Sequence, residues 1–149
     1  MPARNVLKKN KFRLIALDVP KGLKTSCLHK LSQIVFKYFE LSPKNLELQF
    51  VHSRQMKELN SQFRFKNKTT DVLSFKLDTS DLIGCIVIDL DVAEVQSKRF
   101  GHSLSQEILE LYLHGLLHLL GFDHETAPDF DLMARYQDFF LSQNLSKIS

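Results

Sequence analysis

Three histidines fall within one eleven-residue segment at a spacing that suits a shared metal ion. His114 and His118 are four residues apart, so on an α-helix their side chains project from one face on consecutive turns. Gly121 stands where a left-handed residue would end that helix, which lets His124 approach from the following loop. Three neutral imidazoles leave one open position on a tetrahedral Zn²⁺, as in catalytic sites. The sequence therefore predicts one Zn²⁺ per chain, bound by His114, His118 and His124.

The alternative is that these histidines are unrelated, and a pair four residues apart does not exclude it. The residues around His114 and His118 are apolar, however, and an imidazole without a partner is unfavourable in such surroundings. Half of the six histidines also lie in this one segment. Asp123 either orients one of the imidazoles as a hydrogen-bond acceptor or is an ordinary turn residue, and the sequence leaves both roles open.

The same histidine spacing occurs in metzincin zinc peptidases, so proteolysis must be considered. Those enzymes need Glu directly after the first histidine, as the base that activates the zinc-bound water. Gly115 occupies that position. A peptidase is therefore the weaker interpretation.

Patterns of apolar residues predict how this segment is positioned. Strands are expected at 12–17, 46–51, 71–75 and 83–88, the last apolar enough to be central. Helices are expected at 28–39 (ended by Ser42-Pro43), 53–63 and 91–100, then from Ser103 or Ser105 to Leu120, and at 129–144. The last of these helices should bury Met133, spaced helically with Phe130 and Phe140. We therefore expect an α+β fold with one small mixed sheet of about four strands packed with helices.

Length and composition fit one globular domain over residues 1–149. The sequence contains no apolar run long enough to span a membrane, and its polar start lacks the apolar core of a secretory signal. Cys27 and Cys85 are too few for a disulfide framework or a thiolate zinc site. These features indicate a cytoplasmic protein that does not associate with membranes.

Charge is distributed unevenly along the chain. Residues 1–24 carry seven basic residues and one acidic residue. Residues 54–76 carry six basic residues and two acidic residues. Residues 101–149 carry two basic and seven acidic residues. A basic half suits a polyanionic partner, because Lys and Arg neutralise phosphates. A solvated surface explains the same pattern, and charge alone favours that explanation.

Two blocks of sequence resemble the YbeY endoribonucleases, the bacterial rRNA maturation factors. The first is HGLLHLLGFDH at 114–124. The second comprises Glu58-Leu59-Asn60, Arg64 and the segment TDVLSF at 70–75, where Thr69 replaces the proline usual in the family. The order of elements and the length are also similar, so the resemblance covers nearly the whole chain and is weak only in the first 45 residues.

The resemblance implies a zinc-dependent endoribonuclease specific for single-stranded RNA, which matures the 3′ end of small-subunit rRNA and acts in ribosome quality control. His114, His118 and His124 would hold the zinc, and Arg64 would contact the scissile phosphate, where its planar guanidinium can bind in bidentate fashion. The partners would be rRNA and the ribosome or its small-subunit proteins, and not DNA. The attacking group remains open between water and an RNA hydroxyl. A non-catalytic ribosome-assembly factor with a zinc site is the alternative.

One position departs from the family pattern. Members usually read Leu-Gly-Asp-Ile where this chain has Ile83-Gly84-Cys85-Ile86, so Cys85 replaces an acid. Its apolar strand favours an inert buried thiol over a zinc-binding thiolate. The replacement leaves the level of activity open.

Overall fold

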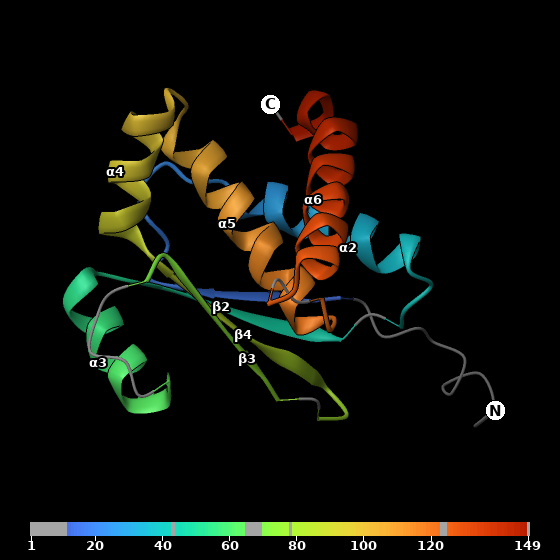
Figure 1. The fold of residues 1–149 in the computed structure, drawn as a ribbon, viewed down its shortest axis with the longest axis horizontal. Coiled ribbons are helices and arrows are strands. Elements are labelled where there is room, and N and C mark those ends of the chain that lie inside the picture. The colour runs from blue at the N-terminus through green and yellow to red at the C-terminus, as the bar shows by residue number, and fades with distance from the viewer. Residues whose placement is uncertain (1–11, 43, 65–69, 78, 123–124, 149) are drawn as a thin grey trace, which may run out of the picture.

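The computed structural model describes residues 12–42, 44–64, 70–77, 79–122 and 125–148, without the side chains of residues 63, 64 and 143–148. Within these residues four strands form one sheet, and five helices surround it (Figure 1). The strands are β1 (Leu14–Leu17), β2 (Asn45–Val51), β3 (Val72–Lys76) and β4 (Leu82–Asp89). The helices are α2 (Thr25–Tyr38), α3 (Ser53–Arg64), α4 (Leu90–Phe100), α5 (Leu104–Leu119) and α6 (Ala127–Ile148).

The sheet is mixed and has the order β1-β2-β4-β3. β1, β2 and β4 are parallel, whereas β3 pairs antiparallel with β4. The predicted α+β class with one small mixed sheet is therefore confirmed, and the apolar strand β4 is central, as expected. No helix in the described part of the chain has the length and apolar character needed to cross a membrane.

The two faces of the sheet meet different helices. Alternate residues of the strands, such as Leu48 and Ile86, face the main core with α2, α5 and α6. The residues between them, such as Leu73 and Val87, form a second cluster with Met56 of α3. This separation follows from the period of two in strand side chains, and it places α3 and α5 on opposite faces of the sheet.

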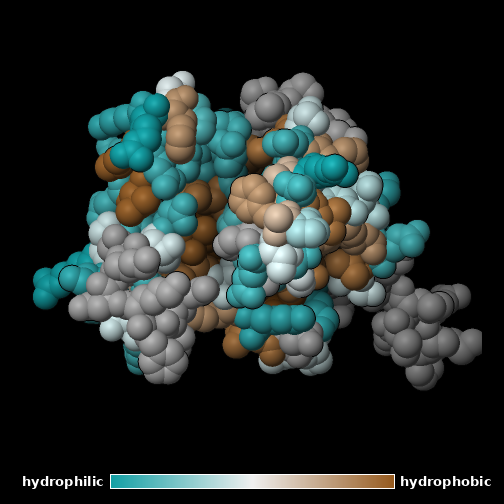
Figure 2. Space-filling view, in the orientation of Figure 1, coloured by the Kyte–Doolittle hydropathy of each residue, from teal (hydrophilic) through white to brown (hydrophobic). Residues whose placement is uncertain are grey.

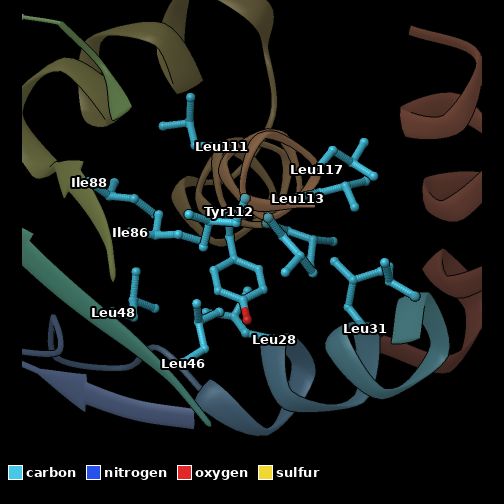
Figure 3. Packing of buried hydrophobic residues seen from close by; sticks show 14 of the residues in the cluster. Leu28, Leu31, Leu46, Leu48, Ile86, Ile88, Leu111, Tyr112, Leu113 and Leu117 are labelled. Carbon is cyan, nitrogen blue, oxygen red and sulfur yellow. The ribbon is translucent and has the colours of Figure 1, made fainter. Parts of the chain in front are cut away.

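Helix α5 runs through the middle of the main core (Figure 3). Ten of its sixteen residues are buried, and Tyr112 points from it toward Leu28 of α2 and Leu46 of β2. Two residues at its ends fix its length. Ser103 caps the start by accepting a hydrogen bond from the amide of Gln106. Gly121 ends it in a left-handed conformation with φ of 102°.

The sequence predicted both ends of α5 correctly and the end of α2 incorrectly. Ser103, one of two predicted start residues, is the cap of α5, and Gly121 closes a Schellman motif in which the amide of Phe122 donates to Leu117. The end of α2 was predicted too late. It stops at Tyr38, ahead of Ser42-Pro43, because Glu40 takes a left-handed conformation and closes the same motif.

Helix α6 begins before Pro128, which a first turn tolerates, and extends to Ile148, beyond the predicted end. Met133 is buried as expected, as is Phe140. Phe130 is 57% exposed and lies outside the core. It lies in the first turn of α6, where residues 127–132 are all exposed.

A buried hydrogen bond between Tyr112 and Ser32 connects α5 to α2. Because the Ser32 hydroxyl already donates to the carbonyl of Leu28 at 2.7 Å, the Tyr112 hydroxyl is the donor to Ser32. Tyr112→Phe should lower the free energy of unfolding by about 1 kcal/mol, since Ser32 keeps its other bond. Ser32→Ala should lower it by about 1–3 kcal/mol, because a buried phenol loses its acceptor.

Urea unfolding followed by far-UV circular dichroism measures both changes. Tyr38→Phe, at a side chain that is half exposed on α2, is the matched control and should leave stability unchanged. A Ser32→Ala variant no less stable than Tyr112→Phe would contradict the assigned direction of the bond.

Candidate metal centre

His114 and His118 lie side by side on α5, as predicted. Their ring centroids are 4.9 Å apart, and the rings cross at 72°. Both side chains are half-buried, whereas Leu113, Gly115 and Leu117 between or beside them are buried. The pair therefore occupies the one side of this part of α5 that the core does not cover. One ion can lie between two imidazoles at this separation, given Zn–N distances of about 2.0–2.1 Å.

Gly115, between the two histidines in sequence, faces the sheet. A Cβ atom there would lie 3.0 Å from both Ile86 Cγ2 and Ser74 Oγ, closer than ordinary van der Waals contact. Ser74 Oγ also donates a hydrogen bond to the carbonyl of Gly115, at 3.0 Å. The position at which a zinc peptidase carries its catalytic Glu is thus occupied by helix–sheet packing, and a side chain there would point away from the histidine pair.

Three predicted site residues cannot be placed. Asp123 and His124 lie outside the described residues, so the third ligand and its neighbour remain predictions. Arg64 is the last residue of α3, and its side chain is likewise not described. The structure brings the side chains of His114 and His118 together, and metal binding by all three histidines stays a prediction.

Comparison with known proteins identifies the family of this chain. The family model for endoribonuclease YbeY matches residues 16–144, which include both sequence blocks and all of α5. The chain belongs to the YbeY family.

Individual relatives cover most of its length. The endoribonuclease YbeY of Nautilia profundicola is 45% identical over 120 residues, which are 79% of this chain and 84% of the relative. That of Aquifex aeolicus is 31% identical over 144 residues, or 94% and 96% of the two chains. A solution structure of a Thermotoga maritima protein has a TM-score of 0.59 and 28% identity, covering 91% of this chain and 93% of the other.

Cys85 lies on the other side of the sheet from the histidines. It packs with the cluster beneath α3, next to Val87, whereas Gly115 of α5 contacts Ile86 on the opposite face. Burial raises the pKa of its thiol to about 11, and Glu47, its partner in the β2–β4 register, adds to this. Cys85 is thus an uncharged thiol at neutral pH, on the face of the sheet opposite His114 and His118.

A second group of metal-binding residue types lies at the other end of α5, and the sequence analysis did not identify it. His102, Glu107 and Glu110 each offer one donor atom, and these atoms all lie within 4.8 Å of one another. Glu107 and Glu110 lie in the first two turns of the helix. The local signal was weak because His102 lies outside the helix and meets the two glutamates only through the turn at Gly101.

The raised pKa of Cys85 predicts slow alkylation. At pH 8 on the order of one thiol in a thousand is ionised at a pKa of about 11, compared with about one in ten at the ordinary value. A Cys27→Ser variant isolates this thiol. We expect iodoacetamide to modify the folded variant about 100-fold more slowly than the urea-unfolded chain, measured by mass spectrometry. Equal rates in the folded and unfolded states would contradict the prediction.

Proposed function

We propose that this protein is a zinc-dependent endoribonuclease that cleaves single-stranded RNA, with His114, His118 and His124 as the zinc ligands. Membership of the YbeY family and the relatives described as endoribonucleases support RNA as the substrate. The single observation that carries the metal site is the adjacency of the half-buried His114 and His118 rings on α5. Its biological role, on this proposal, is maturation of the 3′ end of small-subunit rRNA and ribosome quality control in the cytoplasm.

The donor set fits zinc. Two imidazoles on consecutive turns of a buried helix are held with little freedom, because the residues around them pack into the core. Zn²⁺ bound there would act as a Lewis acid toward a phosphoryl oxygen and would lower the pKa of a bound water. The tether from Ser74 to the Gly115 carbonyl fixes α5 against β3, and so fixes the position from which both histidines project.

Cationic residues on α3 support an RNA-binding role for that helix. Arg54 and Lys57 line a hollow of about 380 Å³ together with Glu58, Ser61 and Gln62. Both cations are exposed, so they can approach phosphates without first losing a buried partner. Arg64 ends the same helix. We assign it to the scissile phosphate, where its guanidinium would bind two oxygens and stabilise developing negative charge.

One observation favours a second candidate function. The YbeY-family acid on β4 is replaced by Cys85, whose uncharged thiol at neutral pH cannot substitute for a carboxylate. If that acid is needed for turnover, the protein would bind rRNA or small-subunit ribosomal proteins during assembly without cleaving RNA.

Single-turnover cleavage of small-subunit rRNA by zinc-loaded protein separates the two functions. We expect cleavage by the wild type, none by His118→Ala, and about 100-fold slower cleavage by Arg64→Ala, since one group that stabilises the transition state is lost. Arg64→Lys should restore little, because an ammonium group cannot bind two oxygens in a fixed fork.

Elemental analysis of the same preparations tests the metal. One zinc should be bound tightly by the wild type and lost from His114→Ala, His118→Ala and His124→Ala. His29→Gln, on α2, is the histidine control and should keep both zinc and activity. Cleavage that persists in His118→Ala and Arg64→Ala would overturn the catalytic proposal, and tightly bound zinc in His124→Ala would show that the third ligand is wrong.

A further inference from the structure

The geometry points to a second divalent-metal site, separate from the histidine pair, formed by His102, Glu107 and Glu110 where α4 meets α5. His102 Nε2 lies 2.6 Å from Glu107 Oε1, and Nδ1 of the same ring lies 3.5 Å from Glu110 Oε2. One donor atom from each residue falls within 4.8 Å of the other two. An imidazole and two carboxylates are ligands that first-row transition-metal ions accept.

The backbone holds these donors in place before any metal binds. Gly101 ends α4 with φ of 70°, and the amide of His102 donates to the carbonyl of Ser97, so His102 closes a Schellman motif. The next residue, Ser103, caps α5. His102 is therefore held between two helix ends, and little conformational entropy has to be lost when its ring coordinates an ion.

Glu107 and Glu110 are separated by three residues, so they project from neighbouring positions on the first turns of α5. The Glu107 side chain is 6% exposed and the Glu110 side chain is 36% exposed. The site thus combines one buried carboxylate with one that is partly exposed to solvent. Figure 2 shows the hydrophilic surface over α4 on one side of this region, with hydrophobic residues recessed between α4 and α6.

The local charge favours a cation. Within the described residues, His102 is the only basic side chain that forms an ion pair with either glutamate. Asp138 of α6 adds a further negative charge that acts on Glu110. A divalent ion would add positive charge beside the buried Glu107 and the partly exposed Glu110.

This site is distinct from the predicted zinc centre. Glu107, Glu110, His114 and His118 follow one another at intervals of three, four and four residues, which places them along one side of α5. Glu107 and Glu110 precede His114 by seven and four residues, or about 10.5 Å and about 6 Å along the axis. Ions in a shared dinuclear centre lie about 3.5–4 Å apart, so the two sites would bind metal independently.

The function of a metal here would be structural. It would connect the turn after α4 to the first two turns of α5, the helix that carries the histidine pair, and would stabilise the folded state because the unfolded chain lacks the site. Removing it should lower the melting temperature without removing the zinc held by the histidines.

Zn²⁺ titration of a His114→Ala/His118→Ala double variant tests this site alone. Isothermal titration calorimetry should show one bound Zn²⁺, and the His102 imidazole resonances should shift in NMR spectra on the same titration. Adding Glu110→Gln should weaken binding about tenfold or more. This change keeps the side-chain size at a partly exposed position, so the fold should be retained, as circular dichroism will check. Glu94→Gln, at an exposed position of α4, is the matched control and should change nothing.

The proposal is overturned if the double variant binds no Zn²⁺, or if its affinity is unchanged by Glu110→Gln. Unshifted His102 resonances during binding would also overturn it, since the ion would then lie elsewhere. A reciprocal variant, His102→Ala/Glu110→Gln, should keep one tightly bound zinc and its RNA cleavage. In the His114→Ala/His118→Ala variant, loss of the tightly bound zinc tests the proposed function. Binding of added Zn²⁺ by the same variant tests the second site.

Discussion

The close contact between α5 and the sheet determines the direction in which His114, His118, Glu107 and Glu110 project from this helix. At Gly115 the helix approaches so closely that a Cβ atom would be 3.0 Å from residues of both β3 and β4. A glycine in the middle of a helix lowers its stability by about 1 kcal/mol relative to alanine, so the close approach must compensate for that loss. Ser74 adds a hydrogen bond to the Gly115 carbonyl at the same point. Together they fix the rotation of α5 about its axis.

That rotation divides α5 into a buried side and a polar side. Tyr112 and the leucines fill the core with α2 and the sheet, and the remaining side carries Glu107, Glu110, His114 and His118. A helix buried on most of its surface tolerates such residues along one stripe, provided that they have partners. His102 supplies a partner to the two glutamates. The proposed zinc would bind the histidine pair farther along the same stripe.

The replacement of an acid by Cys85 acts on the other face of the sheet. Its thiol packs among apolar residues beneath α3 and is neutral at ordinary pH. Cys85 thus faces α3, whereas the next residue of β4, Ile86, faces α5 and its histidines. This is also the face on which Arg54 and Lys57 of α3 are exposed.

The sequence by itself determined the order of helices and strands and the adjacency of His114 and His118 on one helix. Both depend on local periodicity. Residues four apart on a helix must share a side, and Ser103 and Gly121 mark the ends of that helix through their own conformational preferences. The period of two within β4 also implied that Cys85 and Ile86 face opposite ways, although it could not say which face meets α5. Asp123, His124 and the side chain of Arg64 remain predictions from sequence.

Only the tertiary structure decided what depends on contacts between distant segments. The sequence showed that Gly115 stands where a peptidase would carry its catalytic base. Its role in packing depends on contacts with β3 and β4, which precede it by about thirty to forty residues. The meeting of His102 with Glu107 and Glu110 depends on the angle at which two capped helices join, and no periodicity encodes that angle. Local patterns specify which side of an element is polar, whereas the packing of elements against one another specifies which polar groups come together.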